Sequence, residues 1–561
     1  MSDHLLSLLI GIPLAGAVLA LFWPTHRSQD LRVLTVVVCA LEVVMAALVY
    51  LSFNLDLGAT QYDEIADWIT LPLGALGTVS IDYALAVDGI SLPLVLLSGV
   101  VMLVGAISSW NVKARRKAYF SLYLLLSGTV MGCFLAQDLF LFYLFFEFML
   151  LPMYFLIGLW GGPRREYAAI KFFVYTFLGS LLILIVMIGL YLSAIDPLET
   201  AVAMGMISMG EGISLETVQL VQQALAQNQI APEDLVHTFR FDYLADTANY
   251  LPNAWLAPES GVFWGDTPVR LIAFWFLFAG FAVKLPVVPV HTWLPDAHVE
   301  APTAISVVLA GILLKIGGYG FIRIVDGFFP AEAFYSSVPL AILAMISIVY
   351  GGFNALGQYD LKKMIAYSSV SHMGFVLLGI AAFTAEGFNG AIYQMVSHGI
   401  LSAMLFLLAG VLSDRTHDRQ VDNYRGLIEP MPRYAILTGL AFFASLGLPG
   451  FSGFIGELFT LMGAFRAEQI PAWIPALSTL GIVLAAGYFL WTLQRMFFGT
   501  FWYRHQPTAA LLPDLTAREA GLLISLALIT FLLGIFPNLL FSITSSSIEA
   551  WFESLTPQAP Q

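Results

Sequence analysis

The amino-acid sequence predicts an all-α integral membrane protein with about fourteen transmembrane helices. Hydrophobic residues make up 59% of the 561-residue chain and charged residues only 11%, whereas soluble domains carry about 25% charge. A chain of this composition cannot cover itself with polar surface, so lipid must solvate much of it. The apolar stretches are long and do not alternate with polar residues, which favours helices over a β-barrel.

Fourteen apolar stretches are long enough to span a bilayer. They cover residues 4–23, 33–54, 89–110, 118–136, 138–159, 168–194, 270–290, 302–325, 336–356, 364–383, 387–412, 432–465, 473–498 and 517–537. The first stretch lacks a basic start and a small-residue cleavage site, so we interpret it as a membrane helix rather than a signal peptide.

The distribution of basic residues supports this count. If fourteen helices alternate in direction, eighteen of the 24 lysines and arginines fall in connections on one side and four on the other. The positive-inside rule makes the basic side cytoplasmic, so both termini face outward. The long, acidic, lysine-free connection 195–269 then lies outside, and we interpret it as an extended, folded cap. The net charge of −14 argues against nucleic-acid binding, which needs clustered basic residues.

Ionisable residues inside the predicted spans are the main functional signal. The two remaining basic residues, Lys284 and Lys315, lie within spans, and we assign Glu147 and Glu457 as the deep acids. A charge at mid-membrane costs at least about 3 kcal/mol, so such residues are rare and usually functional.

Two of these residues accompany predicted helix breaks, because proline removes a backbone donor and interrupts a helix. The residues that predict the breaks are Pro286 and Pro289 beside Lys284, and Pro449 and Gly450 beside Glu457. The broken spans are the seventh and twelfth, and this offset predicts two inverted five-helix repeats. The predicted organisation is 1–110 for helices 1–3, 111–194 with 270–325 for the first repeat, 336–498 for the second, and 517–537 for helix 14.

Histidines fit between these sites. His372 and His398 lie on consecutive spans, and histidine accepts and releases protons near neutral pH. A single helical histidine is more often a packing residue, but two beside buried lysine and glutamate favour a proton relay. His291 and His298 follow the seventh span, where proton uptake and ordinary loop structure are both open. No metal site is predicted, because the histidines lack enough closely spaced partners.

Redox chemistry is not expected in this chain. Cys39 and Cys133 stand alone in apolar runs, which excludes an iron–sulfur motif and indicates inert buried thiols. No glycine-rich nucleotide fingerprint follows a predicted strand. The sequence therefore indicates translocation rather than electron transfer.

Three segments resemble a known family. LPDAHVEAPTAISVVLAGILLKIGGYGFIR, LKKMIAYSSVSHMGF and FEFMLLPMYFLIGLWGG are similar to the antiporter-like subunits of respiratory NADH–quinone oxidoreductase (complex I) and of the related multisubunit Mrp cation/proton antiporters. In that superfamily the twelfth, broken helix usually carries lysine in L- and N-type subunits and glutamate in M-type subunits. Glu457 matches the M type, whereas the long connection 195–269 exceeds the usual M-type length.

The resemblance implies a role for each matching residue. Glu147 and Lys284 would form an ion pair, Lys315 would connect the two halves, and Glu457 would release protons outward. His372 and His398 would continue the relay between Lys315 and Glu457.

The resemblance also implies a proton-translocating subunit in a bacterial inner membrane, beside L- and N-type membrane subunits. NADH, FMN, iron–sulfur clusters and quinone would belong to other subunits, and no cofactor is expected in this chain. The alternative is a subunit of a multisubunit Na⁺/H⁺ antiporter without redox partners. A lone solute transporter and a membrane scaffold are the remaining hypotheses; no polar pocket motif supports the former, and the embedded charges argue against the latter.

Overall fold

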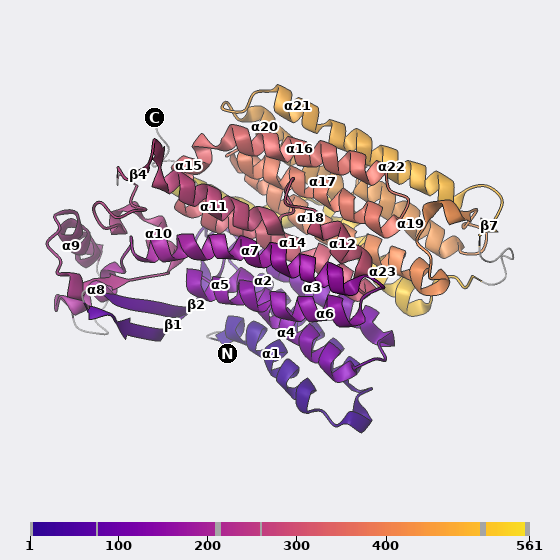
Figure 1. The fold of residues 1–561 in the computed structure, drawn as a ribbon, viewed down its shortest axis with the longest axis horizontal. Coiled ribbons are helices and arrows are strands. Elements are labelled where there is room, and N and C mark those ends of the chain that lie inside the picture. Colours follow the sequence, from indigo (N-terminus) through magenta and orange to yellow (C-terminus); the bar gives the residue numbers. More distant parts are fainter. Residues whose placement is uncertain (1–3, 75–76, 208–214, 259–260, 505–511, 556–561) are drawn as a thin grey trace.

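The computed structural model describes residues 4–74, 77–207, 215–258, 261–504 and 512–555. Its long helices run side by side in one bundle, as Figure 1 shows. Within the described residues, twelve helices are long and apolar enough to cross a membrane. The prediction of an all-α membrane fold is therefore confirmed, whereas the count of fourteen spans stays a prediction.

The twelve long helices are continuous or composed of adjoining helical segments. They are α1 (Leu5–Phe22), α2 (Leu31–Ser52), α3 (Leu92–Ser108), α4 (Arg116–Leu135), α5 with α6 (Leu139–Phe148, Leu150–Trp160), α7 (Arg165–Tyr191), α13 with α14 (Thr303–Val308, Leu314–Gly320), α16 (Ser337–Leu356), α17 (Leu361–Ala381), α18 (Ala385–Thr416), α21 with α22 (Trp473–Ser478, Leu480–Phe497) and α23 (Ala517–Ile535). Of these, α17, α18 and the α13–α14 helix are almost wholly surrounded by protein, so they form the centre of the bundle.

The other two predicted spans are interrupted. Helix α11 (Val269–Lys284) ends at its lysine, and α12 (Trp293–Glu300) begins after an irregular stretch that contains Pro286 and Pro289. Helix α19 (Pro432–Ser445) is likewise separated from α20 (Ser452–Arg466) by a stretch that contains Pro449 and Gly450. Each half of the molecule thus has one interrupted span, and the inverted symmetry between the halves stays a prediction.

The α13–α14 helix is irregular in a different way. A π-helical segment, Leu309–Leu313, separates α13 from α14, and a second, Phe321–Asp326, follows α14. In a π-helix the backbone bonds run from residue i to i+5, and such segments occur frequently at functional sites. Lys315 lies in the single α-helical segment between them.

One end of the bundle carries a mixed α/β cap. Strands β1 (Gln61–Pro72) and β2 (Thr78–Val87) form an antiparallel hairpin, and β3 (Val236–His237) pairs with β2 in parallel. The hairpin, which the sequence analysis did not predict, thereby joins the 195–269 connection, whose helices are α8 (Pro197–Ala203), α9 (Leu215–Ala226) and α10 (Phe241–Ala245). These elements gather at the left of Figure 1.

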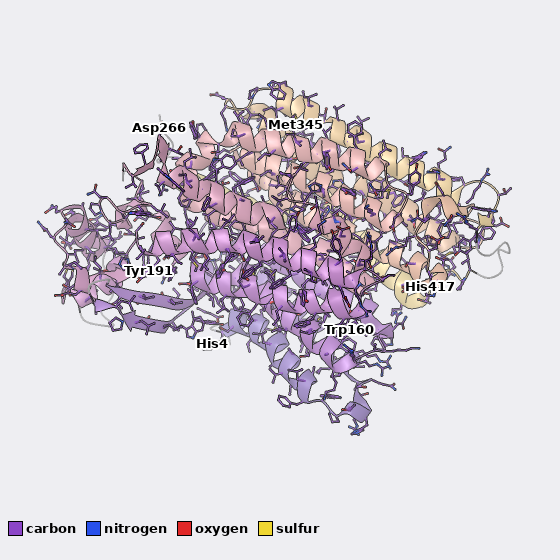
Figure 2. All side chains as sticks on the ribbon, in the orientation of Figure 1. His4, Trp160, Tyr191, Asp266, Met345 and His417 are labelled. Carbon is purple, nitrogen blue, oxygen red and sulfur yellow. The ribbon has the colours of Figure 1, made fainter. Side chains whose placement is uncertain are left out.

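Labelled side chains mark the two ends of the bundle. In Figure 2, Tyr191 and Asp266 lie at the end with the cap, and Trp160 and His417 lie at the opposite end. The indole N–H of Trp160 donates to the carbonyl of Ala114, in the basic connection 111–117, and His417 begins the basic connection that follows α18. These two basic connections therefore lie at the end of the bundle opposite the cap.

Helix α24 (Asn538–Leu555) follows the last predicted span and was not predicted. It packs on α18, where the Thr544 hydroxyl donates to Oδ1 of Asn389 at 2.6 Å. Its Ser547 hydroxyl accepts from the backbone N–H of Gly89 at 2.9 Å. The helix therefore ties the second half of the chain to the start of α3.

The cap contains two acids, Asp196 and Glu199, whose pKa values are higher in the folded protein than in an unfolded chain. Burial raises the pKa of Asp196 to about 6, and burial together with the neighbouring Asp196 raises the pKa of Glu199 to about 7. Both values lie above those of an unfolded chain, so the cap loses stability as pH rises from about 4 to about 7. Hydrogen–deuterium exchange of residues 196–207, corrected for intrinsic rates, should be slower at pH 5 than at pH 8. Glu199→Gln should reduce this difference, and equal protection at both pH values in the unmodified protein would contradict the prediction.

Candidate functional site: a row of buried ionisable side chains

Lys315 is fully enclosed in the centre of the bundle, with no exposed surface. Its ammonium nitrogen lies 2.7 Å from Nδ1 of His398, on α18, and it also donates to the backbone carbonyl of Ala310. That carbonyl belongs to the π-helical segment Leu309–Leu313. The Lys315 ammonium is thus held by the His398 ring and the Ala310 carbonyl, and no carboxylate among the described residues bonds to it.

The row continues from His398 to the second broken helix. The ring centroids of His398 and His372 are 5.6 Å apart, and Nδ1 of His372 lies 3.1 Å from Oε1 of Glu457. The side-chain amide of Gln394 is 3.5 Å from the same His372 nitrogen. Four titratable side chains from α14, α18, α17 and α20 therefore follow one another at contact distance.

A small polar cavity adjoins the two histidines. Its space open to the centre of a water molecule is about 10 Å³, which is about the space one water needs. The side chains that line it with His372 and His398 include Ser368, Ser369, Gln394, Ser402 and Ser445. A water here would have several polar partners and would close the gap between the rings.

Glu457 is buried at the interruption between α19 and α20. One carboxylate oxygen contacts His372, whereas the other, Oε2, has no hydrogen-bond partner among the described residues. The backbone at Gly447 approaches that oxygen so closely that a methyl group on Gly447 would lie 2.8 Å from it. Gly447 also has φ +79°, a conformation that favours glycine. The irregular stretch therefore shapes the pocket of the acid.

Lys284 and Glu147, for which the resemblance implied an ion pair, are not in direct contact in this structure. Among the described residues, the Lys284 ammonium has no hydrogen-bond partner. It lies instead 4.6 Å from the ring centre of Phe146, an arrangement in which the ring face attracts the cation. The two groups still interact electrostatically, so the structure holds them close but separated.

A glycine brings the first break next to the helix of Lys315. A methyl group on Gly317 would lie 2.6 Å from the backbone nitrogen of Leu285 and 3.0 Å from the carbonyl carbon of Lys284. Only glycine permits this approach of α14 to the end of α11. The two buried lysines therefore lie on backbones in direct contact.

His298 lies on α12 and is fully buried. Among the described residues, neither of its ring nitrogens has a hydrogen-bond partner. Its ring stacks on Phe406 at 4.4 Å, and it interacts electrostatically with both Lys315 and Lys362. His291 lies elsewhere, with its ring 5.3 Å from that of Tyr350. Of the two histidines that follow the seventh span, the structure brings His298 alone towards Lys315.

Some buried charges were missed by sequence reasoning. Lys362 was counted with a cytoplasmic connection, but it is buried and donates to the carbonyl of Ala301 at 2.6 Å. Glu42 lies in the middle of a predicted span and is fully buried, so the sequence did contain its signal. Arg323 and Asp88 pair between the end of the α14 helix and the start of α3, a contact that sequence spacing does not reveal.

A cluster of three acidic side chains in the cap has a spacing that could bind a cation. Ligand atoms of Asp67, Asp82 and Glu199, in the cap, lie within 4.8 Å of one another. The prediction that the chain has no metal site stays untested.

The fold and this row of side chains define a class of protein: a polytopic membrane protein that moves small cations through interrupted helices and buried titratable groups. The chain belongs to the family of NADH:quinone oxidoreductase and Mrp antiporter transmembrane proteins, whose sequence profile matches residues 136–216 and 238–484. The matched region contains every member of the row.

Individual relatives are similar over almost the whole chain. NADH-quinone oxidoreductase subunit M of Rhodobacter capsulatus is 39% identical over 552 residues, which cover 97% of this chain and 96% of that protein. NAD(P)H-quinone oxidoreductase chain 4 of a Synechococcus strain is 36% identical over 561 residues, covering 98% and 93% of the two chains.

Solved structures agree on the fold. A chain of respiratory complex I from Thermus thermophilus with bound NADH superposes with a TM-score of 0.76 at 28% identity, covering 98% of this chain and 99% of that one. A chain of the Mrp complex from a Dietzia species gives 0.75 at 19% identity, covering 100% and 99%, and so shares the fold.

The close approach at Gly447 leads to a prediction. Gly447→Ala should lower proton translocation by about tenfold or more, since it strains the backbone and crowds Glu457. Gly439→Ala on α19 is the matched control, because a methyl group there meets nothing within 4 Å. Translocation would be measured in vesicles at equal amounts of assembled complex. Equal activity of the two variants would contradict this account of the stretch.

Proposed function

We propose that this chain is the M-type proton-translocating membrane subunit of a bacterial NADH–quinone oxidoreductase. The single observation that carries the proposal is the continuous row Lys315–His398–His372–Glu457. The names of the relatives and the match to complex I support the assignment. Glu457, rather than lysine, at the second broken helix favours the M type within the family.

The proposed relay begins at Lys284. With Glu147 close, the Lys284 proton is retained; when the two move apart, an uncompensated ammonium in a low-dielectric site is costly, by several kcal/mol. The proton then leaves the Lys284 nitrogen and binds neutral Lys315. Lys315 passes a proton to Nδ1 of His398, and His372 with a bridging water delivers it to Glu457, which releases it outward.

The free energy of proton translocation and that of separating the buried ion pair are of similar size. Lifting one proton against the membrane potential costs about 2.3 kcal/mol per 100 mV. Separation of a buried ion pair changes energies by about 3 kcal/mol or more. Opening the Glu147–Lys284 pair is therefore sufficient to drive one transfer when redox energy from other subunits powers the opening.

On the cytoplasmic side, we propose that protons arrive through His298. Its ring interacts with both Lys362 and Lys315 and has two free nitrogens, so a proton can bind one nitrogen as another leaves from the other. Lys362 would be the first buried carrier. His291, whose ring contacts Tyr350, would either order the stretch between α11 and α12 or take up protons nearer to the cytoplasm.

The same proposal predicts the membrane in which the chain lies, its neighbouring subunits and the location of the cofactors. The chain would lie in the inner membrane with both termini outward, beside L- and N-type subunits. NADH, FMN, iron–sulfur clusters and quinone would be held by other subunits, and this chain would carry no cofactor. A subunit of a Na⁺/H⁺ antiporter is the alternative, which Glu457 disfavours.

The relay is tested by neutralising its members. Lys284→Ala, Lys315→Ala and Glu457→Gln should each reduce NADH-driven proton pumping in vesicles to about a tenth or less, while the complex assembles. Lys113→Ala changes an exposed cytoplasmic lysine and should leave pumping unchanged. Full pumping by the Lys315→Ala complex would overturn the proposal. Sodium-dependent pumping that persists without NADH would favour the antiporter alternative.

The inlet is tested by comparing two histidines. His298→Phe preserves the stacking on Phe406 but removes both ring nitrogens, so pumping at pH 7 should slow several-fold. His291→Phe should slow pumping less. An unchanged rate of pumping by the His298→Phe complex, measured at equal amounts of assembled complex, would exclude His298 from the path.

A further inference from the structure

Glu42, on α2, is a fully buried acid outside the row described above. The Ser127 hydroxyl on α4 lies 2.7 Å from one carboxylate oxygen of Glu42 and 2.8 Å from the other. The serine hydroxyl is the donor to both oxygens, which share its single hydrogen in a three-centre hydrogen bond. One shared hydroxyl hydrogen compensates little for the burial of a carboxylate.

Among the described residues, no cationic side chain interacts with Glu42. Helices α1 and α3, which both pack on α2, carry no titratable residue. The titratable groups that interact with Glu42 are Cys39, on α2 itself, and Tyr123, on α4. A carboxylate buried without a cation costs several kcal/mol, so this environment also favours the neutral acid.

A column of hydroxyl groups leads from Glu42 to the end of the bundle that carries the basic connections. Tyr119, Tyr123 and Ser127 are spaced by four residues and so share one face of α4. The rings of Tyr119 and Tyr123 stack at 6.3 Å, and the Tyr119 hydroxyl lies 2.8 Å from that of Ser109. The Tyr123 hydroxyl donates to the carbonyl of Met102 on α3 at 2.6 Å, so it can relay a proton only when that hydrogen bond opens. Ser109 lies two residues before the basic connection 111–117.

An apolar helix separates this column from the relay. Helix α3 packs against α2 on one side and against α18 and the π-helical segment on the other. On the relay side, Val101 meets Gly311 and Leu97 meets Gly399. Proton transfer across this interface would need a polar carrier that these residues do not provide.

We propose that Glu42 is a second proton-binding site, which exchanges its proton with the cytoplasmic side along the hydroxyls of Tyr123, Tyr119 and Ser109. In each exchange the O–H bond of Glu42 breaks as a neighbouring hydroxyl or water oxygen takes that proton and passes on its own. The same steps run in reverse to reload the acid. Loss of the proton would place a negative charge at mid-depth beside α3.

Infrared difference spectroscopy of the intact purified complex tests the site. The spectrum of the unmodified complex minus Glu42→Gln should contain the carbonyl stretch of a neutral carboxylic acid at pH 7, where exposed acids are ionised. That band should shift in D₂O, and the shift should develop more slowly in a Tyr119→Phe/Tyr123→Phe complex. Asp56→Asn, which changes an exposed acid, should give carboxylate bands instead.

Two outcomes would overturn the proposal: carboxylate bands in the Glu42 difference spectrum at pH 7, or a neutral-acid band that never shifts in D₂O. If the Glu42→Gln complex fails to assemble, Ser127→Ala serves, because loss of its hydrogen bond should move the same carbonyl band. A Ser127→Ala spectrum identical to that of the unmodified complex would also overturn it. None of these readouts depends on pumping, so failure here and failure of the proposed relay are distinguishable.

Discussion

The cost of placing charge in a low-dielectric interior governs the central part of this molecule. Lys315 has no exposed surface, one histidine and one backbone carbonyl as partners, and no carboxylate bonded to it. The ammonium of such a lysine loses its hydration and gains few partners in exchange, so nearby charges and dipoles act strongly on it. The interrupted helices, the close-packed glycines and the polar cavity bring such dipoles and titratable groups to mid-depth.

The two breaks supply different chemistry by similar means. At the first, α11 ends at Lys284, whose ammonium faces the ring of Phe146 and has no hydrogen-bond partner. At the second, the irregular stretch before α20 approaches Glu457 through Gly447. One break thus leaves a cation without a hydrogen-bond partner among the described residues, and the other encloses an acid. In the proposed relay, a proton that leaves the first break would have an acceptor at the second.

The sequence was informative where the signal is a charge in an apolar run. Lys284, Lys315 and Glu457 stand out in this way, and the prolines beside them identify the interruptions. The contact between Lys315 and His398 links residues 83 positions apart, which no local pattern encodes. Whether the Lys284 ammonium meets Glu147 or the adjacent ring depends on side-chain conformation, and the expected ion pair between these residues stays a prediction.

Other features escaped prediction for equally physical reasons. Strands β1 and β2 mix polar with apolar residues, so they contain no apolar run of the length that identified the spans, and β2 also pairs with the distant strand β3. Lys362 sits in the first turn of α17, where composition alone indicates an exposed loop charge. Glu42 lies in an apolar span and is fully buried, so it carries the same sequence signal as Lys315, although no helix break accompanies it.

The winding of the helix around Lys315 has a mechanical consequence. The lysine stands between two π-helical segments, each wound more loosely than an α-helix. Tightening one segment by a single residue turns everything beyond it by about 100° around the axis. If one segment tightens while the other loosens, the intervening turn swivels and both ends of the helix stay fixed. A side chain on that turn can then face different neighbours in alternation, without any displacement of the surrounding bundle.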